Sequence, residues 1–130
     1  MPPELAVSLW VQPEIGGLNR VIFHNGDDGE FLIGLDATDT VYVNYRTSGG
    51  AWQTINTGRI IPPSEWHHIA FSWNSTTDVA YVYVDSKITN ELQPGASLYA
   101  GTDDVTIGSS QGADFFTGVI DEVEMYNKSF

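Results

Sequence analysis

Residues 65–85 read EWHHIAFSWNSTTDVAYVYVD, and they give the clearest indication of the fold. It contains two runs, residues 65–73 and 79–85, that are rich in aromatic and β-branched side chains, the types enriched in β-strands. The residues between them, 74–78, are Asn, Ser, Thr and Asp, which favour turns. The stretch therefore predicts two strands joined by a polar turn.

The rest of the chain repeats this arrangement, with turn residues about every 8 to 12 positions. The expected strands are residues 5–11, 20–24, 30–35, 40–45, 51–56, 65–73, 79–85, 87–92, 105–107 and 116–126. Leu5, Val7, Leu9 and Val11 fall on one face, because side chains alternate between the two faces of a strand. No segment of comparable length has a helical period. The pattern predicts an all-β sandwich or barrel.

The composition describes one globular domain over residues 1–130, with 42% hydrophobic residues. The chain has no cysteine, which excludes disulfides and thiolate metal sites. It has 17 acidic and 5 basic residues, so its net charge is −12. The scattered basic residues cannot form a phosphate-binding surface, so nucleic acid and anionic membrane surfaces are poor partners. No apolar run reaches the roughly 18 residues of a membrane-spanning helix.

Four motifs carry a resemblance to a known family. They are WHHIAFSW at residues 66–73, VYVDS at 82–86, TIG at 106–108 and FTGVIDEVEMYN at 116–127. In this order and spacing they resemble the successive signatures of laminin-G-like domains, which belong with the concanavalin A-like lectins and glucanases. The resemblance covers nearly the whole chain from Ala6 onward.

This resemblance implies an antiparallel jelly-roll β-sandwich and an extracellular or cell-surface role in carbohydrate binding or adhesion. The family usually has a further strand before residues 5–11, whereas only four residues precede them here. We therefore expect a fold that lacks this first strand and exposes a strand edge beside residues 116–126. An unpaired edge is a template for another chain, so the edge predicts a homodimer or a strand supplied by a neighbour, unless charged side chains protect it.

Asp121 is a candidate metal ligand. Strict alternation along residues 117–125 places it on the same face as Val119 and Val123, which we expect to be buried. A buried carboxylate needs hydrogen bonds, an ion pair or a metal. The resemblance implies that Asp121 helps to bind a structural Ca²⁺. The alternative is a carboxylate that only accepts hydrogen bonds from backbone N–H groups.

Two loops hold further acidic and amide side chains. Asp28 precedes one expected strand, and Gln111 and Asp114 lie after another. The loops resemble those in which pentraxins hold the Ca²⁺ that bridges to their ligand, which implies a ligand-binding role for these three residues. The alternative is that the loops are solvated and their polar side chains serve turns.

The four tryptophans divide into two groups. Trp10, Trp66 and Trp73 lie in the motif strands, and we expect them in the core. Trp52 follows Ser48-Gly49-Gly50 at a hairpin, and we expect it to face a ligand. The adjoining strand would add Tyr42, Asn44, Tyr45 and Arg46 to this surface.

The sequence favours a non-catalytic carbohydrate-binding or adhesion module over an enzyme. Glu122 and Glu124 resemble a catalytic Glu-x-Asp-x-Glu strand only superficially, because three alternating acids are absent. His67 and His68 are adjacent in an expected strand, so they face opposite sides and cannot hold one metal together. The remaining alternatives are a structural or protein-binding spacer of an adhesin, surface or phage fibre protein, and a domain related to glycoside hydrolases.

Overall fold

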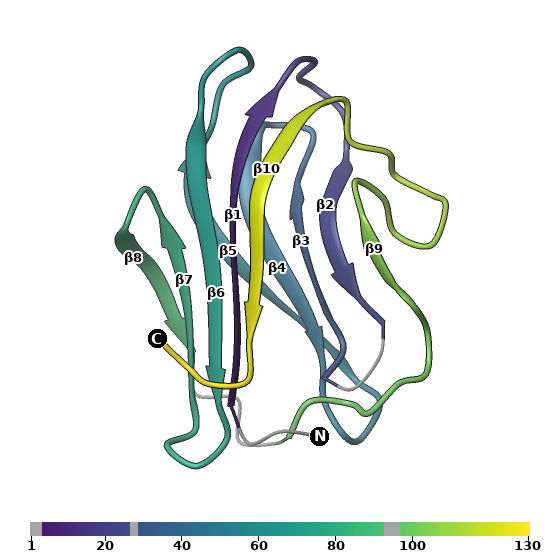
Figure 1. Ribbon diagram of the computed structural model, residues 1–130, viewed down its shortest axis with the longest axis vertical. Helices are drawn as coiled ribbons and strands as arrows, with labels where there is room; N and C mark the ends of the chain where they lie inside the picture. The colour runs from purple at the N-terminus through teal and green to yellow at the C-terminus, as the bar shows by residue number, and fades with distance from the viewer. Residues whose placement is uncertain (1–3, 27–28, 93–96) are drawn as a thin grey trace.

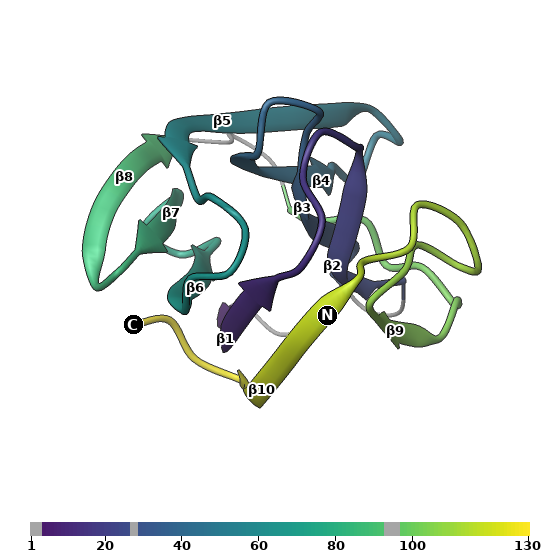
Figure 2. The same cartoon turned by 90° about the horizontal axis from the view of Figure 1, so that it is seen from above.

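The computed structural model describes residues 4–26, 29–92 and 97–130, and it has two antiparallel sheets packed face to face (Figures 1 and 2). Sheet A has the order β10 (Gly118–Tyr126), β1 (Glu4–Pro13), β6 (His67–Asn74), β7 (Val79–Val84) and β8 (Lys87–Leu92). Sheet B has the order β5 (Trp52–Ile60), β4 (Thr40–Arg46), β3 (Phe31–Leu35), β2 (Arg20–Asn25) and β9 (Val105–Ile107). These described ranges contain no helix, and hence none that could cross a membrane. The predicted all-β jelly-roll sandwich is confirmed.

Each predicted strand is present, and the expected bounds of β8 and β9 match those observed. The largest difference is in β5, which continues to Ile60 instead of ending at Asn56. A register shift between Thr40 and Tyr42 lets β4 stay paired with this longer strand. The side-chain hydroxyl of Thr57 also donates to the Val41 carbonyl, at 2.7 Å. These cross-strand contacts, which local composition does not reveal, extend the strand.

The inner faces of the two sheets form one hydrophobic core. Leu5, Val7, Leu9 and Val11 of β1 are fully buried, which confirms the alternation expected for this strand. Their partners in the core include Trp73, whose ring lies 5.8 Å from that of Tyr45 in sheet B. Burial of large side chains such as these is the main stabilising contribution to the fold.

Two tryptophans expected in the core are outside it. Trp10 is 39% exposed and Trp66 is 45% exposed. Trp10 lies between the inward-facing Leu9 and Val11, so alternation turns it to the outer face of sheet A. Trp66 lies one residue before β6 begins. The assumption that motif strands bury all their tryptophans was wrong.

The burial expected for Asp121 and Val119 was also wrong, because β10 contains a β-bulge. Ser8 of β1 pairs with Glu124 and Trp10 pairs with Asp121, so the register shifts between these pairs. Glu122 has a φ of 51° at this point. An extra residue of this kind reverses the alternation that follows it. As a result Ile120 and Val123 pack against the core while Asp121 is exposed.

Strand β10 is at one edge of sheet A, and among the described residues nothing pairs with its outer side. The edge carries the bulge and the exposed carboxylates of Asp121, Glu122 and Glu124. Bulges and charges both oppose pairing with another chain. The edge therefore carries charged side chains and a bulge that protect it, which is one of the alternatives expected from the sequence. Homodimer formation stays a prediction.

Candidate functional site

The outer face of sheet A alternates large and small side chains across its strands. Trp10 of β1 is opposite His68 of β6, and one row further on Ser8 is opposite Ala70. Ala70 is in turn opposite Tyr83 of β7. Large side chains on either side of small ones leave a trough, because the sheet surface is set back where only a methyl or hydroxymethyl group covers it.

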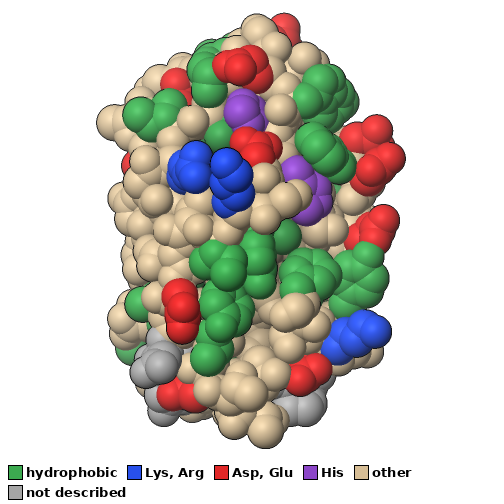
Figure 3. All heavy atoms as spheres, turned by 90° about the vertical axis from the view of Figure 1, so that its left-hand side faces the viewer, with side chains coloured by type: hydrophobic (Ala, Val, Ile, Leu, Met, Phe, Trp, Pro, Cys, Tyr) green, Lys and Arg blue, Asp and Glu red, His purple; other side chains and the backbone are tan. Residues whose placement is uncertain are grey.

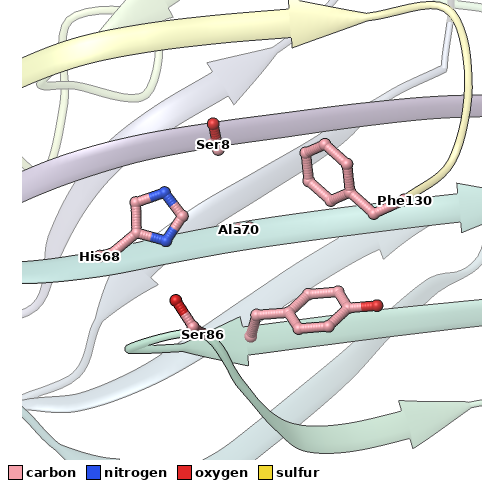
Figure 4. Close-up of a pocket in the computed structure, with 6 residues that line it drawn as sticks. Ser8, His68, Ala70, Ser86 and Phe130 are labelled. Atoms are coloured by element: carbon pink, nitrogen blue, oxygen red, sulfur yellow. The ribbon is translucent and has the colours of Figure 1, made fainter.

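The outer face of sheet A has two hollows, and the second of them lies in this trough. The first, of about 380 Å³, is lined by Trp10, Trp66, Asp121 and Glu122. The second, of about 350 Å³, is lined by Ser8, His68, Ala70, Tyr83, Ser86 and Phe130 (Figure 4). The rings of Trp10 and His68 are in contact, with centroids 5.1 Å apart, so the two hollows adjoin. We call them together the sheet A groove.

The C-terminal segment forms one wall of the groove. The Phe130 N–H donates a hydrogen bond to the Ser72 hydroxyl, at 3.0 Å. Its ring packs edge-on against Tyr126 and Tyr83, at centroid distances of 5.6 and 6.3 Å. Figure 4 shows Phe130 and His68 on opposite sides of Ala70. Sequence reasoning missed Phe130, because a single aromatic residue beyond the last strand has no periodic pattern.

The two adjacent histidines have different surroundings, as expected for neighbours on a strand. His67 is opposite the buried Val11, whereas His68 is opposite Trp10 on the outer face. The carboxylate of Asp85 accepts a hydrogen bond from the His67 Nδ1, at 2.8 Å, and another from the His68 backbone N–H, at 3.1 Å. Burial raises the pKa of Asp85, but these two hydrogen bonds and the electrostatic influence of the two histidines together lower it by more, so the net shift of the pKa is downward.

The β10 side of the sheet A groove is acidic. One oxygen of Asp121 accepts a hydrogen bond from the Glu122 N–H, at 2.8 Å. Among the described residues, neither carboxylate forms an ion pair with Lys or Arg. Figure 3 shows acidic side chains along one flank of this side of the molecule and hydrophobic side chains gathered across it. The groove thus combines aromatic surface with carboxylates that lack a cationic partner in the described chain.

The outer face of sheet B contains the residues that the sequence predicts as ligand-binding. In the register of β4 and β5, Arg46 is opposite Trp52 and Asn44 is opposite Thr54. Tyr42 lies two residues further along the same face, and Trp52 is 46% exposed. We call this surface the sheet B face. The structure brings Trp52, Tyr42, Asn44 and Arg46 together there, but Tyr45 is in the core, so its inclusion was wrong.

Polar side chains of the sheet B face already form hydrogen bonds within the protein. The Thr54 hydroxyl donates to the Asn44 Oδ1, at 2.8 Å. The Arg46 guanidinium donates to Glu30, at 3.5 Å, and lies 4.0 Å from the centre of the Tyr99 ring. A ligand on this face would have to replace these contacts, so it gains less than on a face with free groups.

Tyr42 is also held in place. Its ring lies over Gly34, where an added Cβ would come within 2.7 Å of the ring carbon Cζ. The phenol donates to the Asn19 side chain, at 3.5 Å. Burial, assisted by the negative charges of Asp114 and Asp36, raises the pKa of Tyr42. The phenol therefore stays protonated over a wide pH range.

The predicted loop residues are in different situations. Asp28 lies outside the described residues. Gln111 and Asp114 are exposed and have φ values of 50° and 51°. The Gln111 amide donates to the Asp104 carbonyl, at 2.7 Å, and the Asp114 carbonyl accepts from the Val21 N–H. Both residues thus have turn roles, and their role in ligand binding stays a prediction.

No group of three or more His, Cys, Asp or Glu side chains that could hold a metal ion occurs among residues 4–26, 29–92 and 97–130. Ca²⁺ takes about six to eight oxygen ligands. Asp121 has one neighbouring carboxylate, Glu122, at an exposed bulge. The described residues around Asp121 therefore do not form a calcium site by themselves, and calcium binding stays a prediction.

Comparison with known proteins identifies the family. A family model described as the concanavalin A-like lectin/glucanases superfamily matches residues 3–130, and the chain belongs to this superfamily. No curated protein sequence matches the chain.

Several solved structures share the fold. The CBM40 module of the Ruminococcus gnavus IT-sialidase, bound to α2,3-sialyllactose, has a TM-score of 0.83 and 17% identity, covering 99% of this chain and 78% of that one. Domain 4 of AbnA, a GH43 extracellular arabinanase from Geobacillus stearothermophilus, in complex with arabinotriose, has a TM-score of 0.72 and 23% identity, covering 98% and 62%. A SAP-like pentraxin from Limulus polyphemus has a TM-score of 0.73 and 14% identity, covering 99% and 66%.

Proposed function

We propose that this chain is a non-catalytic carbohydrate-binding module whose ligand occupies the sheet A groove. The observation that supports the proposal most is the placement of Trp10 and Trp66, both half-exposed, around one hollow on the outer face of sheet A. The sequence-based proposal of carbohydrate binding is retained, and its position moves from the sheet B face to the opposite side of the sandwich.

The chemistry of the groove suits a sugar. Aromatic rings pack against the apolar C–H faces of a pyranose, and an exposed aromatic surface in a hollow is favoured for such contacts. The second hollow adds polar groups that can bond hydroxyls, namely Ser8, Ser86 and the His68 ring. A few polar groups set into a largely apolar surface fix the orientation of a ligand.

The proteins of similar fold support the proposal at the level of the fold. One is described in complex with sialyllactose and another with arabinotriose. Both are parts of glycan-degrading enzymes and are described as a binding module or a numbered domain. An extracellular or cell-surface location, which the family resemblance implies, belongs to the same proposal.

The separation of Glu122 from Glu124 supports a non-catalytic role for this pair of carboxylates. Glycoside hydrolysis in retaining enzymes uses two carboxyl groups about 5 to 5.5 Å apart that flank one bond. Glu122 lines the first hollow, but Glu124 does not, and its carboxylate accepts the hydrogen bond of the Tyr126 phenol. The two glutamates that resembled a catalytic pair in the sequence therefore do not converge on one site.

The test is a glycan array followed by titration calorimetry with the best ligand. Stacking on an aromatic ring contributes about 1 kcal/mol, so Trp10→Ala and Trp66→Ala should each weaken binding about five- to tenfold. Trp52→Ala is the matched control on the sheet B face. Loss of binding in Trp52→Ala alone would place the ligand on the sheet B face instead, and no glycan binding at all would favour the protein-binding spacer.

A further inference from the structure

We propose that the hollow between Trp10 and Trp66 recognises a glycan whose sugars carry free amino groups, and that it disfavours sugars bearing carboxylate or sulfate. This inference rests on the proposed function, since it names the ligand class of the same groove. It is carried by the geometry of β10 and by the charges that line the hollow.

The β-bulge directs two consecutive carboxylates to the same hollow. In a regular strand Asp121 and Glu122 would point to opposite faces. At the bulge Glu122 has a positive φ, and both residues line the hollow together with the two tryptophans. Bulges commonly re-aim a side chain in this way at functional positions. Both side chains are therefore available to the same ligand.

These two carboxylates have unused bonding capacity. Asp121 uses one oxygen to accept the Glu122 N–H, and its other oxygen has no recorded partner among the described residues. The Glu122 carboxylate makes no hydrogen bond or ion pair with any described residue. Among the described residues, Arg20 forms an ion pair with Asp39 and Arg46 forms one with Glu30, both away from this hollow. A cation supplied by the ligand would satisfy both carboxylates.

The aromatic walls favour the same charge. The face of an indole ring is electron-rich and attracts a cation within about 6 Å. An ammonium group beside Trp10 or Trp66 would thus be attracted by the ring faces and by charge-assisted hydrogen bonds to Asp121 and Glu122. The ring carbons of the same sugar would keep their stacking contact with the indoles.

An anionic sugar meets the opposite situation. Its carboxylate or sulfate would approach Asp121 and Glu122, and neither Lys nor Arg lines this hollow. The net charge of −12 adds a long-range repulsion. The module of similar fold that is described with sialyllactose shows that this fold can accommodate an acidic sugar. The charge at this groove predicts a different preference for the present chain.

The test compares glucosamine oligomers with N-acetylglucosamine oligomers of the same length, which differ only in whether the amine is free. Oligomers of a uronic acid are the third ligand. Calorimetry compares all three ligands at the same pH and ionic strength. We expect the amine-bearing oligomer to bind about tenfold more tightly than the acetylated one, with a preference that declines as salt screens the charges. The uronic acid oligomer should bind least.

Two variants distinguish the contribution of the carboxylates in the hollow from that of the overall negative charge. The double variant Asp121→Asn/Glu122→Gln keeps the shape of the hollow and should bring the two glucosamine ligands to similar affinity. Glu124→Gln removes one charge from the same strand outside the hollow, so it should retain the preference. Loss of the preference in Glu124→Gln would identify a general attraction to an acidic protein and overturn the inference. Thermal melts verify that each variant is folded.

The failure of this inference differs from the failure of the proposed function. If the acetylated or the uronic acid oligomer binds as tightly as the amine-bearing one, and Trp10→Ala weakens that binding, the groove binds carbohydrate but the amine preference is wrong. If none of the ligands responds to Trp10→Ala or Trp66→Ala, the placement of the carbohydrate site in this groove is wrong as well.

Discussion

The sheet A groove and the sheet B face both carry exposed tryptophan, but they differ in the state of the groups around it. On the sheet B face, Asn44 and Arg46 are bonded to Thr54 and Glu30. In the sheet A groove, Asp121 and Glu122 have no cationic partner among the described residues, and two hollows separate the large side chains. This difference is the reason for placing the proposed site in the sheet A groove, because exposed aromatic side chains there adjoin carboxylates that have no cationic partner among the described residues.

The largest difference in glycan affinity between variants of the two faces should come from filling part of the sheet A groove. Ser8 is part of its floor and lies opposite Ala70, so Ser8→Trp would place an indole in the second hollow. Tryptophan is well tolerated in a strand, so the fold should persist while glycan affinity falls by at least about tenfold. Thr54→Trp makes the equivalent change on the sheet B face and should leave calorimetric binding unchanged. Equal losses in the two variants would remove the distinction between the faces.

A substitution beneath Tyr42 on the sheet B face should change the stability of the fold but not glycan affinity. A Cβ at Gly34 would come within 2.7 Å of the Tyr42 ring and 2.8 Å of the Arg20 carbonyl. Overpacking of this kind costs about 1–3 kcal/mol, so Gly34→Ala should lower the denaturation midpoint and leave glycan affinity intact. Gly49→Ala, where nothing lies within 4 Å of the added Cβ, is the control. A loss of glycan binding in Gly34→Ala at full folding would give the sheet B face a role in recognition.

A smaller effect concerns pH and the end of the groove near Asp85. Because hydrogen bonds from His67 and His68 lower the pKa of Asp85 in the folded chain, the carboxylate stabilises the fold above its unfolded pKa of about 3.9. This contribution is lost as pH falls through the lower folded pKa. The side chain is 49% exposed, so solvent screening keeps the effect small.

The measurement is the melting temperature of the native chain and of Asp85→Asn between neutral and acidic pH. Above about pH 4 the variant should melt at a lower temperature than the native chain, and the difference should shrink in more acidic solution. A constant difference at every pH would show that the hydrogen bonds do not depend on the charge of Asp85. Asp36, whose pKa is lowered chiefly by the Thr38 hydroxyl, provides the same comparison beside sheet B.

The smallest expected effect is calcium binding at Asp121, which the family resemblance implies. With Ca²⁺ at a concentration equal to its dissociation constant, binding to the folded state alone adds about 0.4 kcal/mol of stability. Melting curves in Ca²⁺ and in EDTA should differ slightly for the native chain and coincide for Asp121→Asn. If the two proteins respond identically, Asp121 is not a calcium ligand. A response lost only in Asp28→Asn would move the ion to the loop that the pentraxin resemblance indicates.

Most of the fold follows from local patterns in the chain. The ten strands, their turns and the inward faces of β1, β3 and β4 agree with period-two alternation and with turn composition. The same alternation places Trp10 outside the core, since it lies between Leu9 and Val11. This part of the groove was therefore predictable from the sequence, although we expected this tryptophan in the core.

The rest of the site depends on contacts between distant segments. Whether Asp121 faces the core is decided by how β10 pairs with β1, and the shift between the Ser8–Glu124 and Trp10–Asp121 pairs is invisible in the local pattern. A single extra residue reverses every later side chain. The wall formed by Phe130 depends in the same way on where the C-terminal segment crosses sheet A.

The class of the fold and the positions of the strands could be read from the amino-acid sequence, because both follow from short-range periodicity and turn composition. The four sequence motifs carried the resemblance to the family. The arrangement of side chains on the two outer faces was revealed only by the tertiary structure. It depends on which polar groups are hydrogen-bonded to one another and on where large and small side chains from three strands meet. These two features depend on strand register, and register is set by the pairing of segments that are far apart in the chain.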